Sequence, residues 1–185
     1  TVLVQAQAQL DQIAAAMSSA MSDETVTSAP VTSGAQNGFN IDTAGLLDGN
    51  VIHLTYTDTL TSVVHNVSIV RVDDPTALPL DDSATIDPND EVIGVDFSGG
   101  LAAVVTALNA EFNGKVNFSN PGGTALWMLD DGAANNSSIN SVTATRTVTG
   151  FADGGGQLPF FNDAGVPFSG SITSLGSPSV GFAGR

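Results

Sequence analysis

Two stretches in the middle of the chain alternate between apolar and polar residues, and this period of two constrains the fold more than any other feature. The stretches are residues 51–57 and 63–72; in the first, Ile52, Leu54 and Tyr56 alternate with polar side chains. Successive side chains of a strand point to opposite faces, so the alternation predicts two strands with one buried face. The Thr, Asp and Ser residues between them predict a turn, and therefore a hairpin.

A helix is predicted directly after a third strand at 92–97. Its apolar residues recur at steps that place them on one helix face: Leu101, Val104, Val105, Leu108 and Phe112. Asn113 and Gly114 then favour the left-handed conformation that ends a helix. Short Gly- and Asn-rich turns and further β-rich runs follow. We therefore predict an α+β fold, a mainly antiparallel β-sheet domain with one packed helix at about 101–112.

The first 22 residues follow a different period. Apolar residues recur at alternating steps of three and four, which is the spacing of a coiled-coil seam, and they include Leu3, Leu10, Ile13 and Met17. We predict a coiled-coil-type helix at about 3–22. Because the pattern is already running at residue 1 with no N-cap residue before it, we expect this helix to be truncated from a longer one. The alternative is a short amphipathic helix packed on this same domain.

The composition changes along the chain and divides it into three parts. Residues 23–37 are rich in Ser, Thr, Pro and Gly, which predicts a linker or an edge segment. Beyond the last predicted strand Gly, Ser and Pro dominate again, with isolated Phe residues as anchors. We expect the end of a long seam helix at 1–22, a β-rich α+β outer domain at 23–150, and an extended segment packed on the body at 151–185. One short strand is expected at about 168–173.

The charge of the chain excludes two classes of partner. Lys and Arg number 4 and Asp and Glu number 19, which gives a formal net charge of −15. No basic surface for the phosphates of nucleic acid or for anionic lipid can be assembled from so few cations. We therefore expect neither nucleic acid nor a membrane as a partner. There are no cysteines, which excludes disulfides, thiol catalysis and thiolate metal sites.

Groups that could catalyse a reaction are scarce. The only histidines, His53 and His65, both fall in the predicted hairpin, and no nucleophile motif accompanies them. Paired acids could cleave a glycoside, and three adjacent pairs occur: Asp73–Asp74, Asp81–Asp82 and Asp130–Asp131. Neighbouring residues on a strand point to opposite faces, so none of these pairs is itself a catalytic dyad. We expect no catalytic residue, no cofactor and no enzymatic activity.

The acidic segment DPNDE at 87–91 is the best candidate for a metal site. It offers oxygen ligands from Asp87, Asn89, Asp90 and Glu91, and calcium prefers several such ligands from one loop. The segment lacks the Gly and the later bidentate Glu of an EF-hand loop, so we assign no metal site. A secreted surface adhesin or a calcium-dependent carbohydrate-binding module stays open as an alternative function.

Several segments together resemble a known family. They are LDQIAAAMSSAMSD, GNVIHLTYTDTLTSVVHNVSIVRVDDPTALPL, DFSGGLAAVVTALNAEF and FSNPGGTALWMLDDGAANN. In them the chain resembles the FlgK family of hook-associated proteins of the bacterial flagellum, in which a long N-terminal helix gives way to an outer domain. The similarity covers nearly the whole chain and consists of fold patterns rather than catalytic motifs.

The resemblance implies a structural domain at the junction between hook and filament. Such a protein is extracellular and is secreted through the flagellar channel without a cleaved signal peptide. Its partners would be other flagellar axial subunits and copies of itself, which polymerise through terminal helices. The seam residues Leu3, Leu10, Ile13 and Met17 would then pack on those helices, and the present chain would be a monomer or a weak helix-mediated dimer.

Overall fold

The computed structural model describes residues 2–80, 87, 89–153, 155–161 and 165–169. The chain divides into two compact units. Unit 1 comprises Thr1–Thr25, Gly45–Asn50 and Thr145–Arg185, and unit 2 comprises Val26–Ala44 and Val51–Ala144. Each unit is described by itself below.

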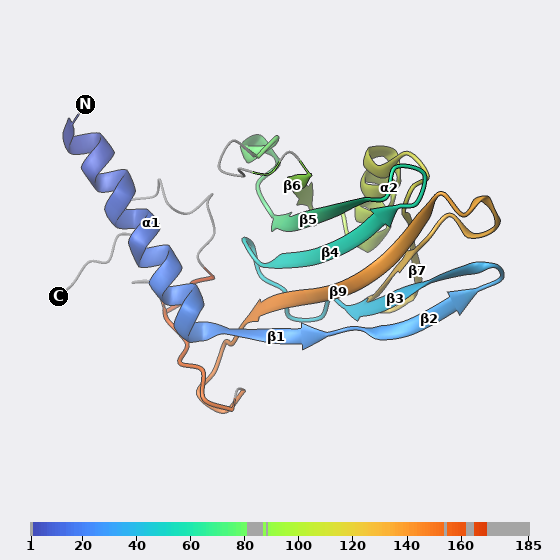
Figure 1. The fold of residues 1–185 in the computed structure, drawn as a ribbon. Coiled ribbons are helices and arrows are strands. Elements are labelled where there is room, and N and C mark those ends of the chain that lie inside the picture. The colour runs from blue at the N-terminus through green and yellow to red at the C-terminus, as the bar shows by residue number, and fades with distance from the viewer. Residues whose placement is uncertain (1, 81–86, 88, 154, 162–164, 170–185) are drawn as a thin grey trace. The chain divides into compact units, whose positions relative to one another are not determined.

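The strands form two sheets (Figure 1). Unit 2 holds most of the strands. The five-stranded sheet has the order β1 (Asp23–Thr27), β9 (Ser137–Thr147), β4 (Val51–Asp58), β5 (Val63–Val72), β6 (Asp90–Asp96). The four-stranded sheet has the order β2 (Ala29–Ser33), β3 (Gln36–Asp42), β8 (Ala125–Leu129), β7 (Asn117–Gly122). With the helices α1 (Val2–Ser22) and α2 (Leu101–Phe112), this arrangement confirms an α+β, mainly β fold.

The predicted hairpin is confirmed as β4 and β5, with its buried face, and the structure gives its register. The strands pair antiparallel, and Ile52 lies opposite Ile69 while Leu54 lies opposite Val67. All four side chains are buried. The alternating sequence thus places one row of apolar residues in the core of unit 2, and the other face carries polar side chains such as His53 and Ser68 together with the buried Val70.

The predicted central helix is confirmed as α2 (Leu101–Phe112). Its residues Val104, Leu108 and Phe112 are buried, and α2 packs on β6 and β7. Phe112 lies 4.9 Å from Phe118 between ring centroids, so the last turn of the helix contacts the start of β7. Asn113 takes a left-handed conformation and ends the helix, as the sequence predicted.

The structure decides between the two interpretations of 23–37, which were a linker and an edge segment. Strands β1 and β2 and the start of β3 occupy this segment, and β1 and β2 each lie at an edge of a sheet, which matches the second interpretation. Thr and Val in the segment suit a strand, and Pro30 is tolerated because an edge strand needs fewer backbone donors. Gly34, with φ of 60°, makes the turn between β2 and β3.

One pair of strands departs from the antiparallel pattern. Strands β5 and β6 run parallel, with Ile69 opposite Ile93. The long acidic connection between them, which includes the short helix η1 (Pro75–Ala77), returns the chain to the same end of the sheet before β6 begins. Side chains of Leu78 and Leu80 from this connection lie against Gly94 of β6.

Unit 1 contains the N-terminal helix α1 (Val2–Ser22) and the segment that follows β9. The helix predicted at about 3–22 is therefore present. The backbone N–H of Leu158 donates to the carbonyl of Met21 at 2.9 Å, so the segment after β9 runs beside the last turn of α1. Phe161 and Pro167 form an isolated bridge. Phe168 and Ser169 lie outside any strand, and the rest of the strand predicted at 168–173 lies outside the described residues.

Candidate functional site

An exposed apolar row on α1 is the most prominent surface feature of unit 1. It consists of Leu10, Ile13, Met17 and Met21, which are 42–61% exposed, and we call these four residues the apolar row. At about 100° per residue they fall within a sector of about 80° on the helix. Three of the four predicted seam residues thus share one exposed face. The side chain of the remaining seam residue, Leu3, lies outside the described part.

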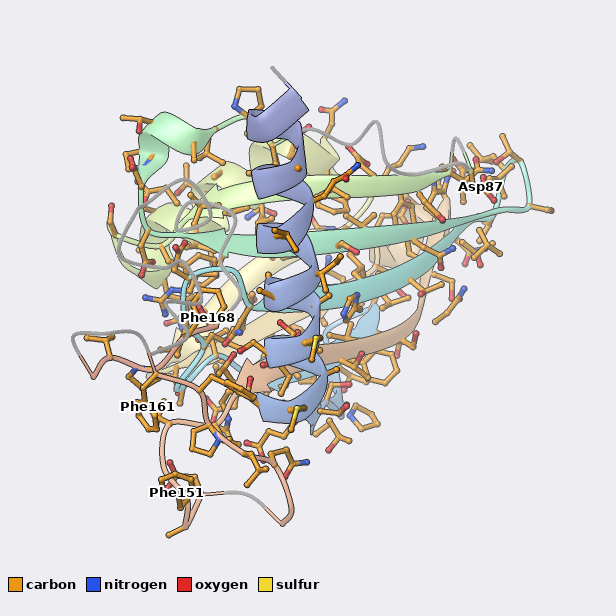
Figure 2. The ribbon with its side chains drawn as sticks, turned by 90° about the vertical axis from the view of Figure 1, so that its left-hand side faces the viewer. Asp87, Phe151, Phe161 and Phe168 are labelled. Carbon is orange, nitrogen blue, oxygen red and sulfur yellow. The ribbon has the colours of Figure 1, made fainter. Side chains whose placement is uncertain are left out.

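A different face of α1 packs inside unit 1. Ala15, Ser18 and Ser22 are buried, and they are centred about 130° around the helix from the apolar row. The Ser18 hydroxyl donates to the carbonyl of Phe168, and the Ser22 carbonyl accepts from the backbone N–H of Val148. The helix is therefore held by its small-residue face, and among the described residues the apolar row stays exposed. Figure 2 draws α1 with its side chains.

A buried polar network fixes the point where α1 passes into β1. The Thr147 hydroxyl donates to the Asp23 carboxylate at 2.7 Å and accepts from the Asn50 amide at 2.8 Å. The Asn50 side-chain oxygen in turn accepts from the backbone N–H groups of Leu47 and Thr147. Burial raises the pKa of Asp23, and its hydrogen bonds from Thr147 and Ser22 oppose that shift. The network ties the junction of α1 and β1 to the end of β9 within unit 1.

An ion pair beside this network crosses from β9 to β1. The Arg146 Nε donates to Glu24 at 2.8 Å, and a second guanidinium nitrogen bonds the same carboxylate. These residues line a cavity of about 340 Å³ together with Gly45, Thr149 and Asp153, and the Thr149 hydroxyl bonds Asp153. Because Glu24 engages the guanidinium through two nitrogens, the pair joins the two strands within unit 1.

A second exposed apolar group lies on the segment after β9. Phe151 is 77% exposed, and its ring lies 6.3 Å from that of Phe161 between centroids. Leu158 and Val166 are also exposed. Figure 2 labels both rings and Phe168. The sequence predicted isolated Phe anchors in this segment, but Phe161 is exposed. The exposed Phe151 was not predicted, because it lies in a Gly-rich stretch without periodicity.

The two histidines cannot act together. Register places His53 opposite Ser68 and His65 opposite Tyr56, so the two rings lie on opposite faces of the sheet. His65 stacks on Tyr56, with centroids 4.9 Å apart and planes 13° apart. The structure therefore brings no nucleophile and base together at the predicted hairpin.

The acidic pairs bind neighbouring groups of unit 2 separately. Asp73 pairs with Arg71 at 2.9 Å, and Asp74 caps η1 through the backbone N–H of Thr76. Asp130 accepts from the N–H groups of Asn37 and Gly132, whereas Asp131 accepts from those of Asn136 and Ser137. Hydrogen bonds to these groups lower the pKa of Asp74 and Asp131 against their desolvation. Asp81 and Asp82 lie outside the described residues.

In the acidic segment 87–91, Asp87 and Asn89 lie in the turn before β6, and Asp90 and Glu91 begin that strand. Asp87 accepts from the backbone and the side chain of Asn89 at 2.9 Å, and Asp90 accepts from the side chain of Asn66 at 2.9 Å (Asp87 is labelled in Figure 2). Among the described residues, no three acidic or histidine side chains gather as a metal site would require. The Asp87 carboxylate thus stabilises a turn, and the Asp90 carboxylate bonds a side chain of the neighbouring strand β5.

Comparisons with models of protein families, with curated proteins and with solved structures found no match to this chain. Within the described residues, neither helix has the length and apolar content that a membrane span requires.

Proposed function

We propose that the chain is a structural, non-enzymatic domain of a flagellar protein at the junction between hook and filament. The protein would be secreted through the flagellar channel and would lie outside the cell. Its partners would be other axial subunits and further copies of the full-length protein. The exposed apolar row on α1 is the single observation that carries this proposal, because the described part of unit 1 leaves these four side chains without a cover.

The chemistry of the row supports packing against another helix. Its residues are aliphatic or thioether side chains at steps of three and four, the arrangement by which one helix inserts side chains between those of another. Such a contact buries apolar area without requiring a charged partner. The resemblance to the hook-associated proteins, which polymerise through terminal helices, gives the same kind of partner.

The rest of the described chain adds support of a weaker kind. Its carboxylates accept hydrogen bonds from nearby backbone and side-chain groups, and its two histidines lie on opposite faces of one sheet. A β-rich domain joined to a packing helix is what a subunit of a large assembly requires.

The proposal is tested in the bacterium that carries the gene. A strain that lacks the gene is complemented with the full-length protein carrying Leu10→Ser, Ile13→Ser and Met17→Ser together. We expect swimming to be lost and filaments to be shed, because the row can no longer pack on a neighbouring helix. The matched control carries Gln9→Ser and Ala16→Ser, at exposed positions of α1 outside the row, and should swim normally. Normal motility with the triple variant would contradict the proposal.

The rival function, calcium-dependent binding at a surface, is tested by thermal unfolding. A ligand that binds only the folded state raises the melting temperature by an amount that grows with its concentration relative to its Kd. We expect the melting temperature to be equal in millimolar calcium and in chelator. A rise of several degrees with calcium would favour the binding module instead.

A further inference from the structure

Two Asn-Gly dipeptides occur in the chain, at Asn37–Gly38 and Asn113–Gly114. Asparagine is chemically labile in proteins. When glycine follows it, the absence of a Cβ leaves the next backbone nitrogen accessible and the backbone free to rotate, so that this nitrogen can attack the side-chain amide carbon. Two copies of the same dipeptide in one chain allow their structural settings to be compared.

Asn113 lies where the backbone is least restrained. It is the residue that ends α2, with φ of 46° and ψ of 42°, and it is followed by Gly114 with φ of 84°. Both residues are exposed, and neither belongs to a helix or a strand. The ends of helices open locally at a much lower free energy than the core. The rotation that brings the Gly114 nitrogen to the Asn113 side chain thus requires only a local change.

Asn37 carries an exposed side chain, but its backbone is held in β3 by two hydrogen bonds. Its N–H donates to the Asp130 carboxylate at 3.0 Å, and its carbonyl accepts from the Asp130 N–H at 2.9 Å. Gly38 lies opposite Leu129 in the sheet. A Cβ built on Gly38 would lie 1.9 Å from the Met128 carbonyl oxygen, so the backbone at this point is closely covered. Rotation at Asn37 would require β3 to separate from β8.

We propose that Asn113 is a site of spontaneous modification and that Asn37 is protected by the fold. The Gly114 backbone nitrogen attacks the side-chain carbonyl carbon of Asn113, loses its proton, and expels the amide nitrogen as ammonia. A five-membered succinimide ring results. Water then opens the ring at either carbonyl and leaves aspartate or isoaspartate at position 113, with no oxidant or reductant required.

The modification has a defined structural consequence. It places a negative charge at the C-terminal end of α2, where the helix dipole is also negative. The isoaspartate product adds a backbone carbon at the residue whose left-handed conformation ends the helix. Both products therefore act against the last turn of α2, which carries the buried Phe112. Conversion would gradually weaken the contact of this turn with Phe118.

The test follows both asparagines in one sample. The full chain is incubated at mildly alkaline pH, folded or in concentrated urea, and digested with trypsin. Cleavage after Arg71 and Lys115 places Asn37 and Asn113 in different peptides, and mass spectrometry with chromatography identifies aspartate and isoaspartate in each. We expect Asn113 to convert at least about tenfold faster than Asn37 in the folded chain, and the two rates to approach each other in urea.

The variant Asn113→Gln assigns the product, because its longer side chain forms the ring far more slowly. The product in the 72–115 peptide should disappear in this variant. Equal conversion of the two asparagines in the folded chain, or faster conversion of Asn37, would overturn the proposal. Slow conversion of Asn113 in the folded chain together with rapid conversion in urea would overturn it equally.

Discussion

The side chain of Asn109 on α2 performs the role of a neighbouring strand for β7. Its amide nitrogen donates to the Phe118 carbonyl at 2.8 Å, and its amide oxygen accepts from the Phe118 N–H at 2.8 Å. Strand β7 is the last strand of its sheet, and Phe118 lies opposite Met128 of β8 on its other side. The two hydrogen bonds therefore give partners to the backbone N–H and carbonyl of Phe118, a buried residue at the outer edge of β7.

Replacing Asn109 with Ala tests this role. Each intramolecular hydrogen bond contributes about 1 kcal/mol net, and a buried group left without a partner costs about 1 to 3 kcal/mol. Losing both bonds at Phe118 should therefore lower the free energy of unfolding by about 2 to 3 kcal/mol. Alanine is the better helix former, so helix propensity cannot explain a loss.

The assay is urea unfolding followed by the fluorescence of Trp127, the only tryptophan. Trp127 lies on β8 opposite Ser119 of β7, so its emission reports the sheet that Asn109 supports. The midpoint should fall while the slope stays unchanged. The control is Thr106→Ala on the exposed side of α2, which should stay within about 0.5 kcal/mol of the unaltered protein. A change of less than about 0.5 kcal/mol for Asn109→Ala would refute the reasoning.

Three further predictions follow from unit 2. Leu108 is fully buried on α2, so Leu108→Ala should cost about 2 to 5 kcal/mol in the same urea assay, because it leaves a cavity. The Lys115 ammonium lies 2.8 Å from Asp58 and lowers the pKa of that carboxyl to about 2. The ionised Asp58 therefore stabilises the fold above about pH 4, and this stabilisation is lost as the pH falls towards 2. The difference in urea midpoint between the unaltered protein and Asp58→Asn should accordingly narrow between pH 5 and pH 2. The variant Asn113→Asp should unfold at lower urea concentration than the unaltered protein, by about 0.3 to 1 kcal/mol, and high salt should reduce the difference.

Each of these has an outcome that contradicts it. An unchanged midpoint for Leu108→Ala would mean that α2 does not contribute to the core. A difference in urea midpoint between the unaltered protein and Asp58→Asn that stays constant across the pH range would mean that the ion pair with Lys115 does not lower the pKa of Asp58. A salt-independent effect of Asn113→Asp would point away from the helix dipole.

The elements that sequence periodicity could predict are those whose pattern is local. The hairpin of β4 and β5 follows from alternation, and α2 follows from apolar residues on one face together with Asn113 at its end. Strands β1 and β3 pair with strands that are distant in sequence; Phe39 of β3, for example, pairs with Met128. Strand β2 pairs only with its neighbour β3, and its Ser, Thr and Pro residues show no clear alternation. The parallel direction of β6 likewise depends on the path of a long connection, which carries no periodic signal.

Of the candidate site, too, only the feature with a local sequence pattern could be predicted. The apolar row could be predicted from the spacing of Leu10, Ile13 and Met17, because a helix converts that spacing directly into one face. The network of Asp23, Asn50 and Thr147 could not, since these residues are far apart in sequence and each is common in turns. The spacing predicts the exposed face and does not identify what covers it.

The position of the full-length protein on the cell tests the central claim most directly. Immunogold electron microscopy of motile cells that carry an epitope-tagged copy locates it without further assumptions. The account predicts gold particles in a narrow band where the filament meets the hook. Label spread over the cell surface, or retained inside cells that swim normally, would contradict it.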